Sequence, residues 1–105
     1  MANYVLVYKG GGGMASTVEE RQAIMATWNV WFGSLGESLV DGGNPFGPST
    51  TISTDGAVAE TGASSLTGYS IISAEDLAAA TEKAKGCPVL ANGGSLEVYE
   101  TFQAM

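Results

Sequence analysis

The sequence predicts an α+β domain with a ferredoxin-like βαββαβ order, in which an antiparallel sheet carries both helices on one face. Three observations lead to this prediction. Short runs of β-branched and aromatic residues alternate with two helical patterns, many glycines separate these elements, and no internal repeat or linker interrupts the chain. All 105 residues are assigned to one domain, because a chain of this length has no room for a second core of ordinary size.

The first strand is predicted over residues 3–8, where apolar side chains alternate between two faces. One face carries Tyr4, Leu6 and Tyr8, and the other carries Val5 and Val7. Because both faces are apolar, a central strand covered on both sides is expected. The glycine run at residues 10–13 lacks the Gly-Lys-Ser/Thr ending of a phosphate-binding loop and is therefore predicted to be a flexible connection.

A helix is predicted over residues 16–39, beginning at Ser16 or Thr17, with Glu19 or Glu20 completing a capping box. One face of this helix is apolar and contains both tryptophans of the chain: Ile24, Trp28, Trp31, Phe32 and Leu35. Two interpretations are open. The aromatic rings fill the core between helix and sheet, or at least one indole lines a cleft that suits a small organic ligand.

The middle of the chain is rich in turns. Residues 41–48 contain Pro45 and Pro48, which exclude a helix there. Three features are predicted to follow: a modest strand over residues 50–54, a turn at Asp55 and Gly56, and an irregular loop or ragged sheet edge over residues 57–65.

The second half is predicted to repeat the alternation of strand and helix. A strand is expected over residues 66–72, and Ser73 is expected to cap the second helix, with Asp76 at the third position. The helix presents an alanine-rich face to the sheet: Leu77, Ala80, Thr81 and Ala84.

The last part of the chain completes the predicted order. Gly86 and Pro88 are expected to end the second helix. A final strand is predicted over residues 95–102, where apolar and polar side chains alternate. The full order is therefore strand, helix, strand, strand, helix, strand.

Composition excludes several classes of partner. Eleven acidic side chains against four basic ones give a net charge of −7, which argues against binding to nucleic acid or to an anionic membrane surface. No segment approaches the roughly 18 apolar residues of a membrane-spanning helix. The first residues do not have the features of a signal peptide. A cytoplasmic protein is therefore expected.

The chain contains no histidine, and Cys87 is its single cysteine. No intrachain disulfide is therefore expected, which suits a reducing compartment. No carboxylate spacing matches a calcium-binding loop, so no metal and no cofactor are predicted.

Asp41 is the candidate catalytic residue. It begins a turn next to an apolar run, where partial burial would suit a general acid or base. The alternative is a solvated turn aspartate that caps its own backbone. In the same turn, Asn44 would offer its amide to a carbonyl or oxyanion, or would serve the turn alone.

Tyrosines on the predicted strands are further candidates. Tyr4, Tyr8 and Tyr69 either line a pocket with their hydroxyls or only place them at the rim of ordinary packing, and both interpretations stay open. The residues predicted to contact a small organic ligand are Tyr8, Trp28, Trp31, Phe32, Asn44 and Tyr69.

Six short stretches resemble the YCII-related family, including its branch with an Asp-Gly-Pro-Phe motif. They follow in the family's order over nearly the whole chain, at residues 3–8, 19–21, 40–45, 54–61, 66–69 and 96–99. Asp55 and Gly56 stand where the branch usually reads Asp-Gly-Pro-Phe, and Ala57 and Val58 replace its last two residues. Some members carry a histidine in the first helix, where this chain has Trp28 or a neighbour.

The resemblance implies a ferredoxin-like domain that pairs with a second copy as a dimeric α/β barrel, with a cleft between helix and sheet in each subunit. The function expected first is binding of a small, apolar or aromatic organic molecule in this cleft. If the protein is an enzyme, the resemblance implies cofactor-free chemistry of an isomerase, lyase or monooxygenase type. The alternative is a non-enzymatic accessory or regulatory dimer, of a kind associated with sigma factors.

Overall fold

The computed structural model describes residues 2–10, 17–47, 49–60, 66–91 and 93–103. The strands within these ranges are β1 (Ala2–Lys9), β2 (Leu39–Asp41), β3 (Thr50–Ile52), β4 (Val58–Glu60), β5 (Leu66–Ala74) and β6 (Ser95–Glu100). The helices are α1 (Val18–Leu35), α2 (Leu77–Ala84) and α3 (Pro88–Ala91), and a short 3-10 helix, η1, covers Gly36–Ser38.

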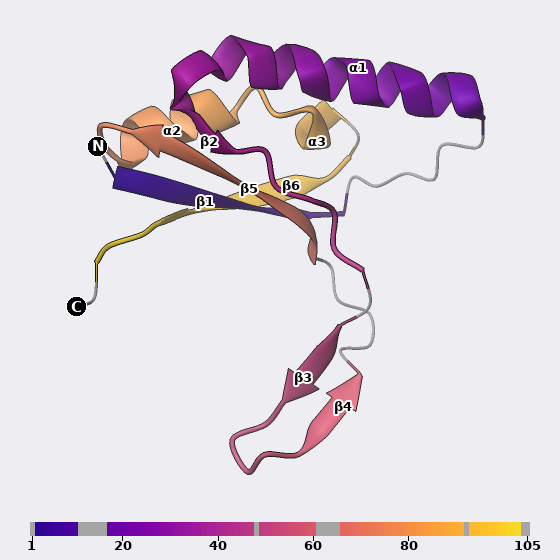
Figure 1. Cartoon of the computed structure of the whole chain (residues 1–105), viewed down its shortest axis with the longest axis vertical. Helices are drawn as coiled ribbons and strands as arrows, with labels where there is room; N and C mark the ends of the chain where they lie inside the picture. Colours follow the sequence, from indigo (N-terminus) through magenta and orange to yellow (C-terminus); the bar gives the residue numbers. More distant parts are fainter. Residues whose placement is uncertain (1, 11–16, 48, 61–65, 92, 104–105) are drawn as a thin grey trace.

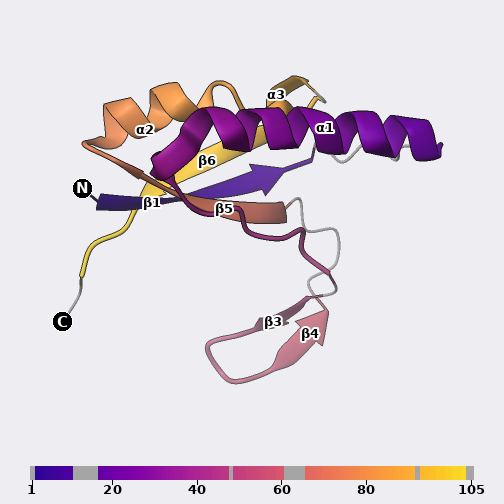
Figure 2. The same cartoon turned by 45° about the horizontal axis from the view of Figure 1, so that its top comes forward.

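The main sheet confirms the predicted α+β class. Its four strands lie in the order β2-β5-β1-β6, and all neighbouring strands are antiparallel. The three α-helices lie on one face of this sheet (Figures 1 and 2). The arrangement is compatible with a ferredoxin-like fold. It departs from the simple βαββαβ order because a separate two-stranded sheet, β3–β4, intervenes between β2 and β5, and because α3 follows α2.

Strand β1 is central, as expected, and pairs with β5 on one side and β6 on the other. Its alternation is confirmed, because Tyr4, Leu6 and Tyr8 are buried under the helices while Val5 and Val7 are only partly buried. The expectation that β1 is covered on both faces is wrong for the single chain, since the described helices all lie on one face. The described helices thus leave one of the two apolar faces of β1 without cover.

Helix α1 begins after Thr17, whose hydroxyl accepts the backbone N–H of Glu20 at 3.1 Å. Ser16, the other predicted cap, lies outside the described residues. The helix ends earlier than predicted, at Leu35, because Gly36 adopts a positive φ of 54°.

The predicted second strand of the sheet is misplaced. Leu39, predicted to end the first helix, and Asp41, predicted to begin a turn, both belong to β2, which pairs with β5. The strand expected over residues 50–54 is β3, which pairs only with β4 among the described strands. A three-residue strand is too short to show a period of two, so its alternation could not be recognised. The predicted turn at Asp55 and Gly56 is confirmed, since the Asp55 carboxylate accepts the N–H of Ala57 at 2.9 Å.

The stretch 57–65, predicted as an irregular loop or a ragged sheet edge, contains the strand β4, and its residues 61–65 lie outside the described ranges.

The second helix also starts later than expected. Ser73 is a strand residue opposite Asn3, and the cap is Asp76, whose carboxylate accepts the N–H of Ala79 at 2.8 Å. The helix ends at Ala84, as the glycine and proline beyond it predict. Pro88, predicted to end this helix, is also the first residue of α3. The first N–H groups of a helix have no partner within the helix, so the missing N–H of proline costs nothing there.

The core lies between the sheet and the helices. Its fully buried side chains include Tyr4 and Leu6 of β1 and Ile72 of β5, and the alanines of α2 and Val89 of α3 close it from above. None of the helices in the described part of the chain combines the length and the apolar character of a membrane-spanning helix.

Candidate functional site

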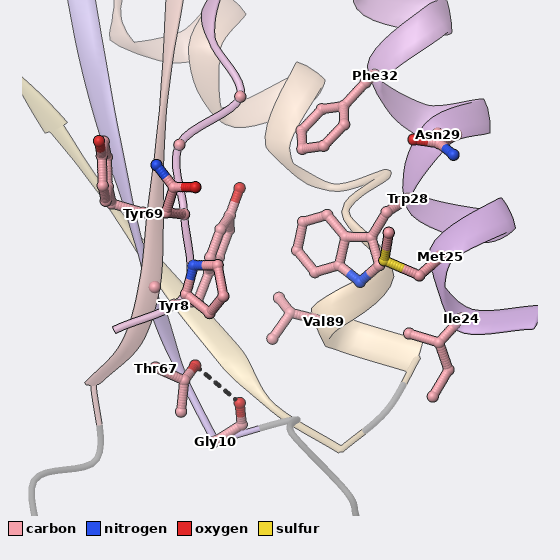
Figure 3. A pocket seen from close by; sticks show the side chains of 15 residues that line it. Tyr8, Gly10, Ile24, Met25, Trp28, Asn29, Phe32, Thr67, Tyr69 and Val89 are labelled. Carbon is pink, nitrogen blue, oxygen red and sulfur yellow. Dashed lines mark hydrogen bonds between the residues drawn. The ribbon is translucent and has the colours of Figure 1, made fainter. Parts of the chain in front are cut away.

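A pocket of about 410 Å³ opens between α1 and the sheet (Figure 3). It lies between the first helix and the sheet, where the resemblance implies a cleft. Five elements or segments contribute lining residues: Ile24, Met25, Trp28, Asn29 and Phe32 from α1, Tyr8 and Gly10 from β1 and its end, Gly42 to Pro45 from the segment after β2, Thr67, Gly68 and Tyr69 from β5, and Val89 from α3.

Aromatic rings form one wall of the pocket. The Trp28 indole meets the Tyr8 ring edge to face, with centroids 5.1 Å apart and planes at 71°. Phe32, one turn further along α1, lies with its centroid 5.7 Å from that of Trp28. Figure 3 shows these rings projecting from α1 and β1 toward each other. Edge contacts of this kind hold each ring in place, so the wall is preformed.

Trp31 does not line this pocket, which corrects its prediction as a ligand contact there. Its side chain is only 6% exposed and its indole N–H donates to the carbonyl oxygen of Lys83 in α2 at 3.3 Å. Residues three positions apart on a helix point about 60° away from each other. Trp28 therefore faces β1 while Trp31 faces α2. The Trp28 indole lines the pocket, and the Trp31 indole fills the core.

The Tyr8 hydroxyl is engaged in a buried chain of hydrogen bonds. It donates to Ser70 Oγ at 2.6 Å, and the Ser70 hydroxyl donates in turn to the carbonyl oxygen of Gly42 at 2.7 Å. Burial raises the pKa of Tyr8 well above its ordinary value, so the phenol stays neutral. The sequence analysis missed Ser70. Its signal was a small polar residue at an inward position of an apolar strand.

The segment after β2 forms the opposite wall. Gly43 has a positive φ of 73°, and a Cβ added there would lie 1.7 Å from the carbonyl oxygen of Tyr69. The Asn44 carbonyl accepts the Tyr69 N–H at 3.4 Å, and the Phe46 N–H donates to the Thr67 carbonyl at 2.9 Å. Asn44 lines the pocket as predicted, on a backbone held tightly against β5.

Asp41 is exposed, so the partial burial expected for it is wrong. Its carboxylate accepts the N–H of Gly43 at 2.8 Å, which is the turn-capping role weighed as the alternative. Asp41 is not among the residues that line the pocket. Its role as a catalytic base stays a prediction.

Tyr69 borders the pocket, but its ring lies on the other side of β5 from Trp28 (Figure 3). Its pairing with Val7 places it on the sheet face that the helices leave open, since the neighbouring pair, Tyr8 and Gly68, faces the helices. There the Tyr69 ring stacks on Phe46, with centroids 5.9 Å apart and planes at 18°. The rings that wall the pocket are those of Tyr8, Trp28 and Phe32.

The residues that line the pocket are uncharged, since none of those described is Asp, Glu, Lys or Arg. Cys87, the single cysteine of the chain, is buried and interacts with Tyr8. Burial raises the pKa of the Cys87 thiol to about 11. A thiol with this pKa is neutral near pH 7 and a poor nucleophile. Within the described ranges, no three His, Cys, Asp or Glu side chains are grouped so as to hold a metal ion. The arrangement is therefore suited to binding by apolar contact and hydrogen bonds.

The chain matches no family model and no curated protein. The resemblance to the YCII-related family thus rests on the six sequence stretches alone and stays a prediction.

Proposed function

We propose that this protein binds a small, uncharged, largely apolar organic molecule in the pocket between α1 and the sheet. The observation that carries the proposal is the lining itself: a cavity of about 410 Å³ with the rings of Tyr8, Trp28 and Phe32 on its walls and no charged residue among its described lining. Pockets with apolar walls and few polar groups are typical of sites for small organic ligands.

The absence of charge in the lining sets the ligand class. A carboxylate entering this pocket would lose its hydration without gaining a cation as partner, which is costly. The net charge of −7 further opposes an anion. Esters, lactones, quinones and neutral aromatic alcohols are therefore favoured over the corresponding acids.

We further propose that α1, α2 and the main sheet form a ferredoxin-like core that pairs with a second copy, in the manner of the dimeric α/β barrels of the YCII-related family. The support is the sheet order and the uncovered sheet face of the single chain. Neither an enzymatic reaction nor a regulatory role is needed for ligand binding, and both stay predictions.

The pocket can be tested with two single-tryptophan variants and one matched pair of probes. The probes are methyl para-bromobenzoate, which is neutral, and para-bromobenzoate, which is an anion; the bromine of either quenches a nearby indole. In Trp31→Phe the remaining Trp28 reports on the pocket, and in Trp28→Phe the remaining Trp31 reports on the core. The ester is expected to quench the emission of Trp31→Phe and to leave that of Trp28→Phe unchanged.

Equilibrium dialysis of the wild-type protein supplies the affinities of the two probes. The anion is expected to bind about tenfold more weakly than the ester or worse, a difference of ~1.4 kcal/mol. Equal or tighter binding of the anion would contradict an uncharged site. Failure of the ester to quench Trp28 at its solubility limit would contradict the pocket as the binding site.

A further inference from the structure

The β3–β4 hairpin stands away from the rest of the molecule. It extends from the side of the sheet opposite the helices (Figures 1 and 2), and its strands form a two-stranded sheet of their own. We call residues 50–60 the arm. Ile52 and Val58 are directly opposite each other in its register and are 69% and 65% exposed.

A hairpin of this kind is not expected to be stable in water by itself. Isolated two-stranded hairpins are marginally stable at best and usually need a third strand or a packed face. Opposed residues of an antiparallel pair point to the same side, so Ile52 and Val58 form one apolar face. That face is suited to packing on another apolar surface.

The open face of the main sheet, on the side away from the helices, is such a surface. Cross-strand pairing aligns Ile71, Val5 and Tyr99 in one row across β5, β1 and β6. The next row contains Tyr69, Val7 and Glu97. Two carboxylates lie at the ends of these rows. Glu97 forms an ion pair with Lys9 and accepts a hydrogen bond from the Tyr99 hydroxyl. Asp41 of β2, which is paired with Ile71, accepts the N–H of Gly43.

The match between the apolar arm and the apolar rows of the open face favours a second copy of this chain as the occupant, because each copy supplies both surfaces. Two molecules with a net charge of −7 repel each other, so an interface between copies needs a surface of low charge. The apolar rows of β5, β1 and β6, with Glu97 paired to Lys9, provide one. A two-fold axis makes the contact reciprocal, so that one interface covers both open faces and both arms.

We propose that the arm seats Ile52 and Val58 on the open face of a second copy, and that this docking is coupled to the pocket. The inference rests on the homodimer put forward under the proposed function. It extends that proposal by naming the element that holds the two copies together and by linking assembly to ligand binding.

The coupling follows from the way the arm is attached. Both of its stems are pocket walls: Gly42 to Pro45 lead into it and Thr67 to Tyr69 lead out of it. The stems are tied together by the bridge between Pro45 and Gly68 and by the hydrogen bond from the Phe46 N–H to the Thr67 carbonyl. An arm held by a second copy therefore steadies the same backbone that a ligand contacts, and linkage requires each event to favour the other.

The test is a double variant, Ile52→Thr with Val58→Thr. Threonine keeps the β-branched shape that suits a strand, so the arm itself is retained. Its hydroxyl replaces a methyl group of Val58 and the ethyl group of Ile52. Sedimentation velocity is expected to give a dimer for the wild type and a dimer dissociation constant about tenfold higher or more for the double variant. The matched control is Val30→Thr, which changes a valine of α1 that is 73% exposed, and its dimer is expected to be unchanged.

Each contrary result points to a different error. If the double variant dimerises as tightly as the wild type, the arm does not hold the dimer together, although the homodimer itself is retained. If the wild type remains monomeric at high micromolar concentration, both the homodimer and the role of the arm are wrong. Binding of methyl para-bromobenzoate to that monomer would still support the proposed ligand-binding function. If the double variant dissociates but binds the ester as tightly as the wild type, the coupling is wrong.

Discussion

The hydroxyl of Tyr8 shows how much a single residue contributes beyond its place on a strand. Its inward direction follows from the alternation of β1, but its partner lies 62 positions further along the chain, in β5. The bond from Tyr8 to Ser70 gives both buried hydroxyls a partner. The Ser70 hydroxyl donates in turn to the carbonyl oxygen of Gly42, at the pocket wall. Buried polar groups that keep their partners cost little, whereas an orphaned one is expensive.

Tyr8→Phe is expected to lower the free energy of unfolding by about 1–2 kcal/mol, because Ser70 loses its buried donor while the aromatic packing on Trp28 is kept. Urea unfolding followed by circular dichroism measures the effect. Tyr4→Phe is the matched control. Its hydroxyl makes a longer bond of 3.3 Å to Glu100 near the edge of the core, so a smaller loss is expected. An equal loss in the two variants would contradict a special role for the Tyr8 chain.

At the scale of elements, the segment between β2 and the arm depends on one glycine. Gly43 adopts a left-handed conformation and lies directly against the backbone of β5, so that no side chain fits. The same turn is closed by the Asp41 carboxylate. The sequence placed a turn here because of its glycines and prolines, yet it did not show which glycine was indispensable.

Gly43→Ala is expected to destabilise the protein by about 2–4 kcal/mol, since the new Cβ would force the segment away from Tyr69. It should also weaken binding of methyl para-bromobenzoate, because the displaced backbone is a pocket wall. Gly47→Ala is the control: a Cβ there meets no atom within 4 Å, and stability should be nearly unchanged. Urea unfolding and equilibrium dialysis of both variants check the two effects, and similar behaviour of the two variants would refute this account of the turn.

At the scale of the whole molecule, the titratable groups that burial keeps neutral in the core between sheet and helices include Tyr8 and Cys87. Both have a pKa raised above the unfolded value, so the folded state holds these protons more tightly than the unfolded state. Their contribution to stability is fully present below the unfolded pKa and is lost as the pH rises through the folded one.

For Cys87, whose pKa rises from 9.0 to about 11, the loss falls between these two pH values. It amounts to as much as ~3 kcal/mol in the free energy of unfolding. Urea unfolding at a series of pH values should therefore show stability decreasing across this window, and Cys87→Ala should reduce the decrease. Parallel pH profiles for wild type and variant would contradict the burial of a protonated thiol.

Much of the architecture could be predicted from local patterns. The alternation of residues 3–8 predicted β1 and its inward face, and the stripe on α1 predicted the aromatic residues that meet the sheet. These signals are strong because a period of two or of 3.6 is repeated several times within one element. The strand β2 and the helix α3 were missed because three or four residues do not repeat any period.

For the candidate site too, local patterns predicted one part and the tertiary structure decided the rest. The sequence by itself determined that an aromatic helix face would lie on an α+β sheet and that Trp28 and Phe32 would share that face. It left open which of the strand tyrosines would meet them. Only the tertiary structure decided that Trp28 borders the pocket while Trp31 fills the core, that Tyr69 turns to the open face, and that Asp41 stays in solvent. The physical reason is that periodicity states which side of an element is apolar, whereas the neighbours that cover that side come from strands and helices far away in the chain.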